Sequence, residues 1–227
     1  MWVCELGLVP YAEALALQKQ LCVRRQLEEV PDTLLLLEHP PVYTRGRRSR
    51  AQELPLGEEA YIARGVEVHD TDRGGRVTYH GPGQLVGYAI MRIADVHAYL
   101  RTMEAAIIAA LAGEGIAARS RAAEGADYTG VWAGERKIAS IGVHVSRGVS
   151  THGFAINVDN ALEPFEWVTA CGLQGVAMTS VQRELGPGRA PDARRFRAAV
   201  AENFCAAHGC KPRLVPRARL EAEELVA

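Results

Sequence analysis

The segment from Thr129 to Gly172 constrains the fold most strongly, because it contains two tight-turn signals between strand-like runs. The signals are Ala133–Glu135 and Ser146–Gly148, and the residues on both sides of each turn alternate in the manner of strands. Glycine in a short turn between alternating runs is typical of β-hairpins. The pattern therefore predicts antiparallel hairpins in this part of the chain.

The rest of the chain mixes helices with strands. Pro10 opens a helix that is expected to run to about Val30, and the continuously apolar run Thr33–Glu38 predicts a buried strand. Further elements are a short helix within 49–65, strands at 66–70 and 85–91, a short helix or strand at 178–185, and helices at 96–111 and 194–208. The helix at 96–111 carries Val96, Leu100, Met103, Ile107 and Leu111 on one face.

Hairpins combined with helices predict an α+β fold. With 227 residues, 48% of them hydrophobic, the chain is long enough for one domain with a full core. We expect a single domain over residues 1–215, with mixed and antiparallel sheets flanked by helices. Residues 216–227 are expected to form a polar, loosely held tail.

Composition excludes several classes of function. A net charge of -1 gives no electrostatic reason to bind nucleic acid or an anionic membrane. No apolar run approaches the roughly 20 residues that span a bilayer, and the N-terminus lacks a signal-peptide pattern. The five cysteines form no CxxC pair and the seven histidines no HExxH or HxH spacing. We therefore expect cytoplasmic thiols, no metal site and no membrane.

Lys137 and Cys171 are the candidate catalytic residues. Lys137 is one of only three lysines in a chain that otherwise uses arginine, and a desolvated amine can exchange a proton as arginine cannot. A reactive thiolate needs a nearby cation, and a thiol paired with a lysine suits acyl transfer. A solvated lysine and a structural thiol are the plainer alternatives. His144 and His152 are rival bases that strand alternation cannot separate.

The stretch from Arg73 to Gln84 is the second candidate segment. Four glycines and a proline within 74–83 let backbone approach a ligand closely and expose N–H groups. The stretch matches neither a Walker A loop nor a dinucleotide fingerprint. GPG alone is a common turn, but Arg73, Arg76, Thr78 and His80 beside it favour the wall of a binding site.

Together these segments resemble the octanoyltransferases that start lipoate assembly, a branch of the biotin/lipoyl protein ligase superfamily. The matching motifs, in the family's order, are EHPPVYT at 38–44, RGGRVTYHGPGQ at 73–84, GVW at 130–132, RKIASIGVHV at 136–145, THGFAINV at 151–158 and ACG at 170–172. Arg45 departs from the family, which usually has leucine there, and we expect only a local surface change. The resemblance implies the α+β fold of the biotin/lipoyl protein ligases.

The resemblance also implies a two-step acyl transfer without cofactor or metal. Cys171 would take octanoate from octanoyl-acyl carrier protein as a thioester. It would then pass the acyl group to a lysine of lipoyl domains, both in the E2 subunits of 2-oxoacid dehydrogenases and in the glycine cleavage H protein. Lys137 would lower the pKa of the thiol and shuttle the proton. The implied substrate-binding residues are Arg73, Gly74, Gly75, Arg76, Val77, Thr78, Tyr79, His80, Ser140, Ile141, Gly142, Gly153, Phe154 and Ala155.

Other functions remain open from the sequence. An ATP-dependent lipoate or biotin ligase would share the fold, and Thr44–Arg48 mimics the Arg/Gly run that biotin ligases use on the adenylate. Such ligases need no nucleophilic thiol, so Cys171 argues against this alternative. A non-catalytic carrier-binding module or a thiol hydrolase are further possibilities.

Overall fold

The computed structural model describes residues 1–169 and 176–222, and their strands form two sheets. The large sheet has eight strands in the order β11-β1-β2-β6-β10-β9-β8-β7, and the small sheet has the order β4-β3-β5. The strands are β1 (Trp2–Leu8), β2 (Thr33–Glu38), β3 (Val42–Arg45), β4 (Glu67–Asp70), β5 (Thr78–His80), β6 (Gln84–Ile90), β7 (Arg119–Ser120), β8 (Gly130–Ala133), β9 (Arg136–Ser146), β10 (Val149–Asn157) and β11 (Arg213–Leu214).

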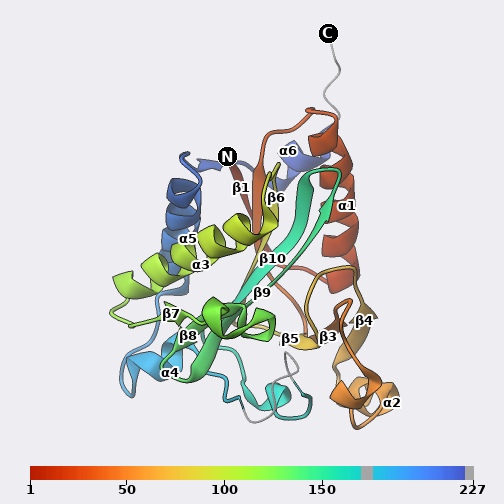
Figure 1. Ribbon diagram of the computed structural model, residues 1–227, viewed down its shortest axis with the longest axis vertical. Helices are drawn as coiled ribbons and strands as arrows, with labels where there is room; N and C mark the ends of the chain where they lie inside the picture. Colours follow the sequence, from red (N-terminus) through yellow and green to blue (C-terminus); the bar gives the residue numbers. More distant parts are fainter. Residues whose placement is uncertain (170–175, 223–227) are drawn as a thin grey trace.

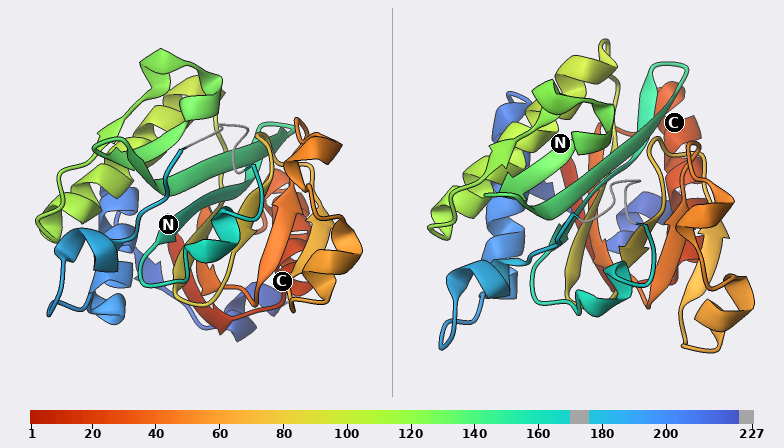
Figure 2. Two further views of the ribbon diagram at one scale, coloured as in Figure 1. Left: turned by 90° about the horizontal axis from the view of Figure 1, so that it is seen from below. Right: turned by 60° about the horizontal axis from the view of Figure 1, so that its bottom comes forward.

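Helices cover both faces of the large sheet. In Figure 1, α3 and α5 lie on one side and α1 on the other, and the small sheet lies beside β9 and β10, as Figure 2 also shows. The α-helices are α1 (Tyr11–Gln26), α2 (Glu58–Ile62), α3 (Val96–Gly113), α4 (Val181–Leu185), α5 (Ala193–Ala207) and α6 (Arg217–Glu221). None of the helices in the described ranges has the length and hydrophobicity that crossing a bilayer requires.

Strand β2 shows why an uninterrupted apolar run is stable at the centre of this sheet. Leu34 and Leu36 pack into the core under α3 and α5, whereas Leu35 and Leu37 pack into the core under α1. Successive side chains of a strand point to opposite faces, so both faces must be apolar when helices cover both. The prediction of a buried strand at Thr33–Glu38 is confirmed.

The predicted hairpin between β9 and β10 is also confirmed, and it forms the longest antiparallel ladder at the centre of the large sheet. Ser140 pairs with Ala155 and Gly142 with Gly153. At the turn, Arg147 and Gly148 have φ of 49° and 77°, the positive values that a two-residue hairpin turn of the favoured hand requires. The strand twist and the turn therefore agree, and the ladder extends over most of both strands.

The two chain ends differ from expectation. Strand β1 was not predicted, although Val3 and Cys4 are fully buried between β11 and β2. The expectation of a loosely held tail is wrong for the described part of 216–227. Leu220 of α6 is fully buried against the α1 side of the sheet, and Arg217 forms a 2.7 Å ion pair with Glu13 of α1. Burial of this apolar side chain, together with the ion pair, docks the short helix.

Candidate active site

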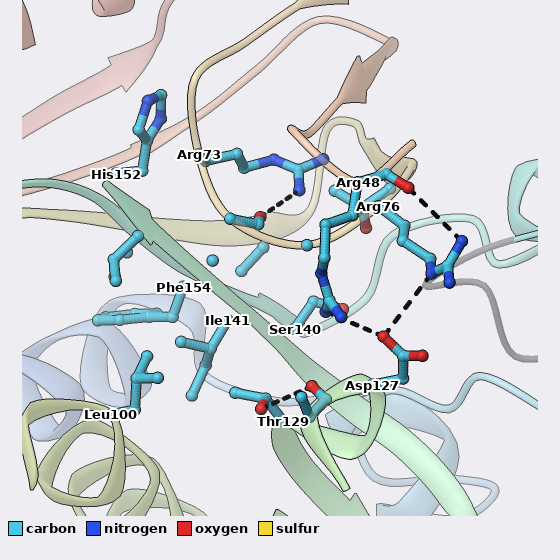
Figure 3. Close-up of a pocket in the computed structure, with 18 of the residues that line it drawn as sticks. Arg48, Arg73, Arg76, Leu100, Asp127, Thr129, Ser140, Ile141, His152 and Phe154 are labelled. Atoms are coloured by element: carbon cyan, nitrogen blue, oxygen red, sulfur yellow. Dashed lines mark hydrogen bonds and ion pairs between the residues drawn. The ribbon is translucent and has the colours of Figure 1, made fainter. Parts of the chain in front are cut away.

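A cavity of about 280 Å³ lies along the middle of β9 and β10 (Figure 3). Its floor is formed by the two central strands, and its walls by the loop after β4, by β5 and by the first turns of α3. The lining includes Arg73, Gly74, Gly75, Arg76, Thr78, His80, Val96, Leu100, Lys137, Ser140, Ile141, Gly142, Val143, His152, Gly153, Phe154 and Ala155. The three segments that carry the implied substrate-binding residues, 73–80, 140–142 and 153–155, thus meet at one cavity.

Glycines let neighbouring backbone segments pack closely against this floor. A β-carbon at Gly142 would lie 2.8 Å from the carbonyl oxygen of Gly74, and one at Gly153 would collide with the carbonyl oxygen of Gly87. The loop after β4 is fastened here, because the Gly74 N–H donates to the Val143 carbonyl at 2.9 Å. Only hydrogen fits at these positions, so the glycines let the backbone of β9 and β10 lie close to the backbone of Gly74 and Gly87.

The other side of the cavity is apolar. Ile141 and Phe154 are paired residues of β9 and β10, and α3 contributes Leu100 and Val96 above them. Figure 3 shows Leu100, Ile141 and Phe154 gathered on one side, away from Arg48 and Arg76. The helical period identified the face of α3 that carries Leu100. It gave no sign that the first turns of this face border a cavity rather than the core.

The side chains of Val77 and Tyr79, which were predicted to bind the substrate, do not line the cavity. Strand alternation in β5 directs Thr78 and His80 toward the cavity, whereas Val77 and Tyr79 pack into the core of the small sheet. Gly83, at the end of the same motif, approaches Asp159 and Asn160 instead, where a β-carbon would clash. The motif at 73–84 is therefore partly cavity wall and partly structural.

Lys137 lies at the β8 end of the cavity floor and is only 2% exposed. Its ammonium nitrogen is 5.4 Å from the centre of the Trp132 ring, within the range of a cation–π interaction. Its backbone N–H donates to Ala177 and its carbonyl accepts from Thr179, at 3.0 and 2.9 Å. Within the described ranges no carboxylate forms an ion pair with it. A buried lysine is uncommon, and this one lines the cavity, so Lys137 is a candidate functional group.

Cys171 lies outside the described residues, but both flanks of its segment are described. On one side, the Thr169 N–H donates to the Glu53 carbonyl at 3.0 Å, and the Glu53 carboxylate binds Arg76 of the cavity wall at 2.7 Å. On the other side, Ala177 binds the backbone of Lys137. Both ends of the segment that carries Cys171 are therefore attached next to the cavity.

Two Arg/Gly segments pair at the mouth of the cavity. The Arg48 N–H donates to the Gly75 carbonyl at 3.0 Å, and this approach requires Gly46, where a β-carbon would lie 2.6 Å from the same oxygen. Asp127 bridges the two guanidinium groups, at 2.9 Å from Arg48 and 3.6 Å from Arg76 (Figure 3). Arg45, which replaces the family's usual leucine, does not line the cavity and forms an ion pair with Asp70 of β4, as expected for a local surface change.

The histidines lie in the half of the ladder nearer the Arg147–Gly148 turn. His152 pairs with Val143, six residues along β9 from Lys137, which corresponds to roughly 20 Å at about 3.3 Å per residue. His144, one residue further along, also lies at that end, where its Nε2 is 3.6 Å from Asp72. Neither histidine is therefore placed to share a proton with Lys137.

The described ranges contain no group of three or more His, Cys, Asp or Glu side chains arranged to bind a metal. His80 is tied instead to Gln84 and Thr44 by hydrogen bonds, and burial keeps its pKa well below the usual value. Arg73 binds the backbone and hydroxyl of Thr44. The polar groups of the cavity are thus arranged by hydrogen bonds within the protein.

Comparison with known proteins identifies the family. The lipoyl protein ligase A/B catalytic domain model matches residues 10–205. The octanoyltransferase of Rubrobacter xylanophilus is 52% identical over 184 residues, which cover 79% of this chain and 81% of that protein. The chain belongs to the octanoyltransferase family. The octanoyltransferase of Caldicellulosiruptor saccharolyticus is 40% identical over 224 residues, 96% of this chain and 93% of its own length.

Solved structures show the same fold. A bi-partite lipoate protein ligase from Thermoplasma acidophilum, studied with its E2 lipoyl domain, superposes with a TM-score of 0.74 and 18% identity. The superposition covers 96% of this chain and 88% of that chain. The expected α+β fold, with mixed sheets flanked by helices as in the biotin/lipoyl protein ligases, is confirmed.

Proposed function

We propose that the chain transfers an octanoyl group from octanoyl-acyl carrier protein to the lysine amine of lipoyl domains in the cytoplasm, through a thioester on Cys171. The acceptors include the E2 subunits of 2-oxoacid dehydrogenases and the glycine cleavage H protein. The observation that carries this proposal is Lys137, a buried lysine that lines a cavity along the central strands β9 and β10. The names of the family members support the transfer of an octanoyl group. The four free thiols of the described residues support the cytoplasmic location.

The first half-reaction exchanges one thioester for another. The Cys171 thiolate attacks the carbonyl carbon of the donor and a new carbon–sulfur bond forms. The bond to the carrier sulfur breaks, and the departing carrier thiolate takes up a proton from the Lys137 ammonium group, which leaves Lys137 neutral. The ammonium group of Lys137 stabilises the attacking thiolate. Because a thioester is consumed and a thioester is formed, this step needs no ATP.

The second half-reaction forms the amide. The acceptor amine attacks the acyl-enzyme carbonyl, the bond to Cys171 breaks, and the proton lost by the amine passes through Lys137 to the departing thiolate. A lysine can accept and return this proton, whereas an arginine stays protonated. The product is an octanoylated lysine, and the enzyme returns to its starting state.

The cavity has the length and the polarity that this substrate requires. An extended octanoyl chain spans roughly 8 Å at about 1.2 Å per bond, well within the roughly 20 Å of β9 between Lys137 and Val143. Burying its seven apolar carbons contributes about 6 kcal/mol before the cost of immobilising the chain. Ile141, Phe154 and Leu100 provide the apolar contacts.

The test is transfer to a lipoyl domain with purified protein, EDTA present and nucleotide removed. We expect octanoylation from octanoyl-carrier protein and none from free octanoate. Cys171→Ala should lose at least several orders of magnitude in turnover, whereas Cys210→Ala, a free thiol in the C-terminal part, is the matched control. Transfer that requires octanoate and ATP would instead identify a ligase, and release of free octanoate without acceptor a hydrolase.

A further inference from the structure

His152 has a left-handed backbone inside a strand. Its φ is 58°, although it lies in the middle of β10 and is paired with Val143 of β9. A residue with a β-carbon adopts this conformation at a cost, and such residues cluster at functional sites. Something in the surrounding structure must therefore hold His152 in place.

The unusual backbone turns the ring to the other face of the sheet. Strand alternation places residue 152 on the same face as Ser150 and Phe154, which contact Tyr99 of α3 and Phe204 of α5. The ring of His152 instead lies 6.1 Å from that of Tyr88, in the core under α1, and its backbone N–H donates to Gln18 of α1 at 2.7 Å. The strain thus moves an imidazole from the α3 side to the α1 side.

On the α1 side, the imidazole meets the loop after β4. His152 is 2% exposed, and its Nε2 donates to the Asp72 carboxylate at 2.7 Å. This hydrogen bond lowers the pKa of Asp72 to about 2, and burial lowers the pKa of His152. At neutral pH the contact is therefore a hydrogen bond from a neutral imidazole to an ionised carboxylate, which is among the stronger kinds.

Asp72 directly precedes the cavity wall Arg73–Arg76. Besides this contact, the wall is attached to β9 by the hydrogen bond from Gly74 to Val143. We propose that His152 and Asp72 are a positioning pair, which holds the Arg73–Arg76 wall against the β9–β10 floor and so sets the affinity for the acyl donor. This inference rests on the proposed function, because the donor is octanoyl-carrier protein.

The first test measures the wall itself. His152→Asn retains a side chain that tolerates left-handed backbone but is too short to reach Asp72. Amide hydrogen exchange at Gly74 should be about tenfold faster in this variant and in Asp72→Asn, and unchanged in His144→Asn. His144 is the matched control because it also faces Asp72, at 3.6 Å, and is not part of the cavity lining.

The second test measures transfer. The KM for octanoyl-carrier protein should rise about tenfold in His152→Asn and Asp72→Asn, with kcat changed by less than twofold and no further rise in the double variant. Unchanged exchange at Gly74, or faster exchange with an unchanged octanoyl KM, overturns the proposal. If amide exchange at Gly74 is faster in the variants but the wild-type protein transfers no octanoyl group, the proposed function is refuted. The attachment of the wall by His152 and Asp72 would still hold.

Discussion

Replacing Lys137 by methionine tests the role of its ammonium group with little disturbance of the packing. The side chain is 2% exposed and tightly surrounded, since a β-carbon at Gly130 would lie only 2.8 Å from its Cε. Truncation to alanine would remove three of the four methylenes of a buried stem, worth roughly 2.4 kcal/mol at about 0.8 kcal/mol per methylene. That is a large part of a typical folding free energy of about 5–15 kcal/mol.

The two other obvious variants are therefore less informative. Lys137→Ala mixes loss of catalysis with loss of stability. Lys137→Arg keeps the charge but places a larger group beside Trp132 and Gly130, where overpacking typically costs about 1–3 kcal/mol. Methionine fills nearly the same volume without a charge or a proton to exchange.

We expect Lys137→Met to retain a melting temperature near that of wild type and to lose about 10²–10⁴-fold in single-turnover octanoyl transfer, the usual range for a general base. Alkylation of Cys171 by iodoacetamide at neutral pH should also slow, because the cation beside the thiolate is gone. Lys19→Met, at an exposed position of α1, is the control. A Lys137→Met protein that transfers within tenfold of wild type would refute the assignment of Lys137 as the base.

Three further predictions follow from the cavity and the buried histidines. Burial lowers the pKa of His39 to about 4, so the unfolded chain takes up the proton first; the free energy of unfolding should fall by up to roughly 3 kcal/mol between pH 6.5 and 4. The free energy of unfolding, measured by urea titration at each pH, should depend less on pH in His39→Asn than in wild type. An equal pH dependence in the two proteins would contradict this assignment. Gly142→Ala should push the Gly74 loop and raise the octanoyl KM, unlike Gly113→Ala, which has open space. Leu100→Ala should shift preference toward longer acyl donors, whereas Ile62→Ala, 57% exposed, should not; an unchanged chain-length profile in Leu100→Ala would place the acyl chain elsewhere.

Local chemistry in the sequence was enough to predict the centre of the fold. The Ser146–Gly148 turn and the alternation around it fix the β9–β10 hairpin, and the TLLLLE run requires a strand with helices on both faces. Lys137 stood out by its residue type, and the structure shows it buried on the cavity floor.

Features that depend on long-range packing could not be predicted. The left-handed backbone of His152 breaks the alternation that would have assigned its face, so sequence could not separate it from His144 as a base. Leu100 looks like a core residue, because helical periodicity does not distinguish a core from a cavity. The docking of α6 combines one apolar residue of a polar segment, Leu220, with the ion pair between Arg217 and Glu13, and the contacted residues of α1 are distant in sequence.

The central claim is that an octanoyl group passes through a covalent thioester on the enzyme. The most direct measurement is the intact mass of the protein after incubation with octanoyl-carrier protein and no acceptor, followed by addition of a lipoyl domain. The account predicts the mass of one octanoyl group on wild type and none on Cys171→Ala. It also predicts that hydroxylamine, which cleaves thioesters, and the lipoyl domain each remove the group. An unmodified wild-type protein that still octanoylates the lipoyl domain, or an adduct that persists in Cys171→Ala, would contradict it.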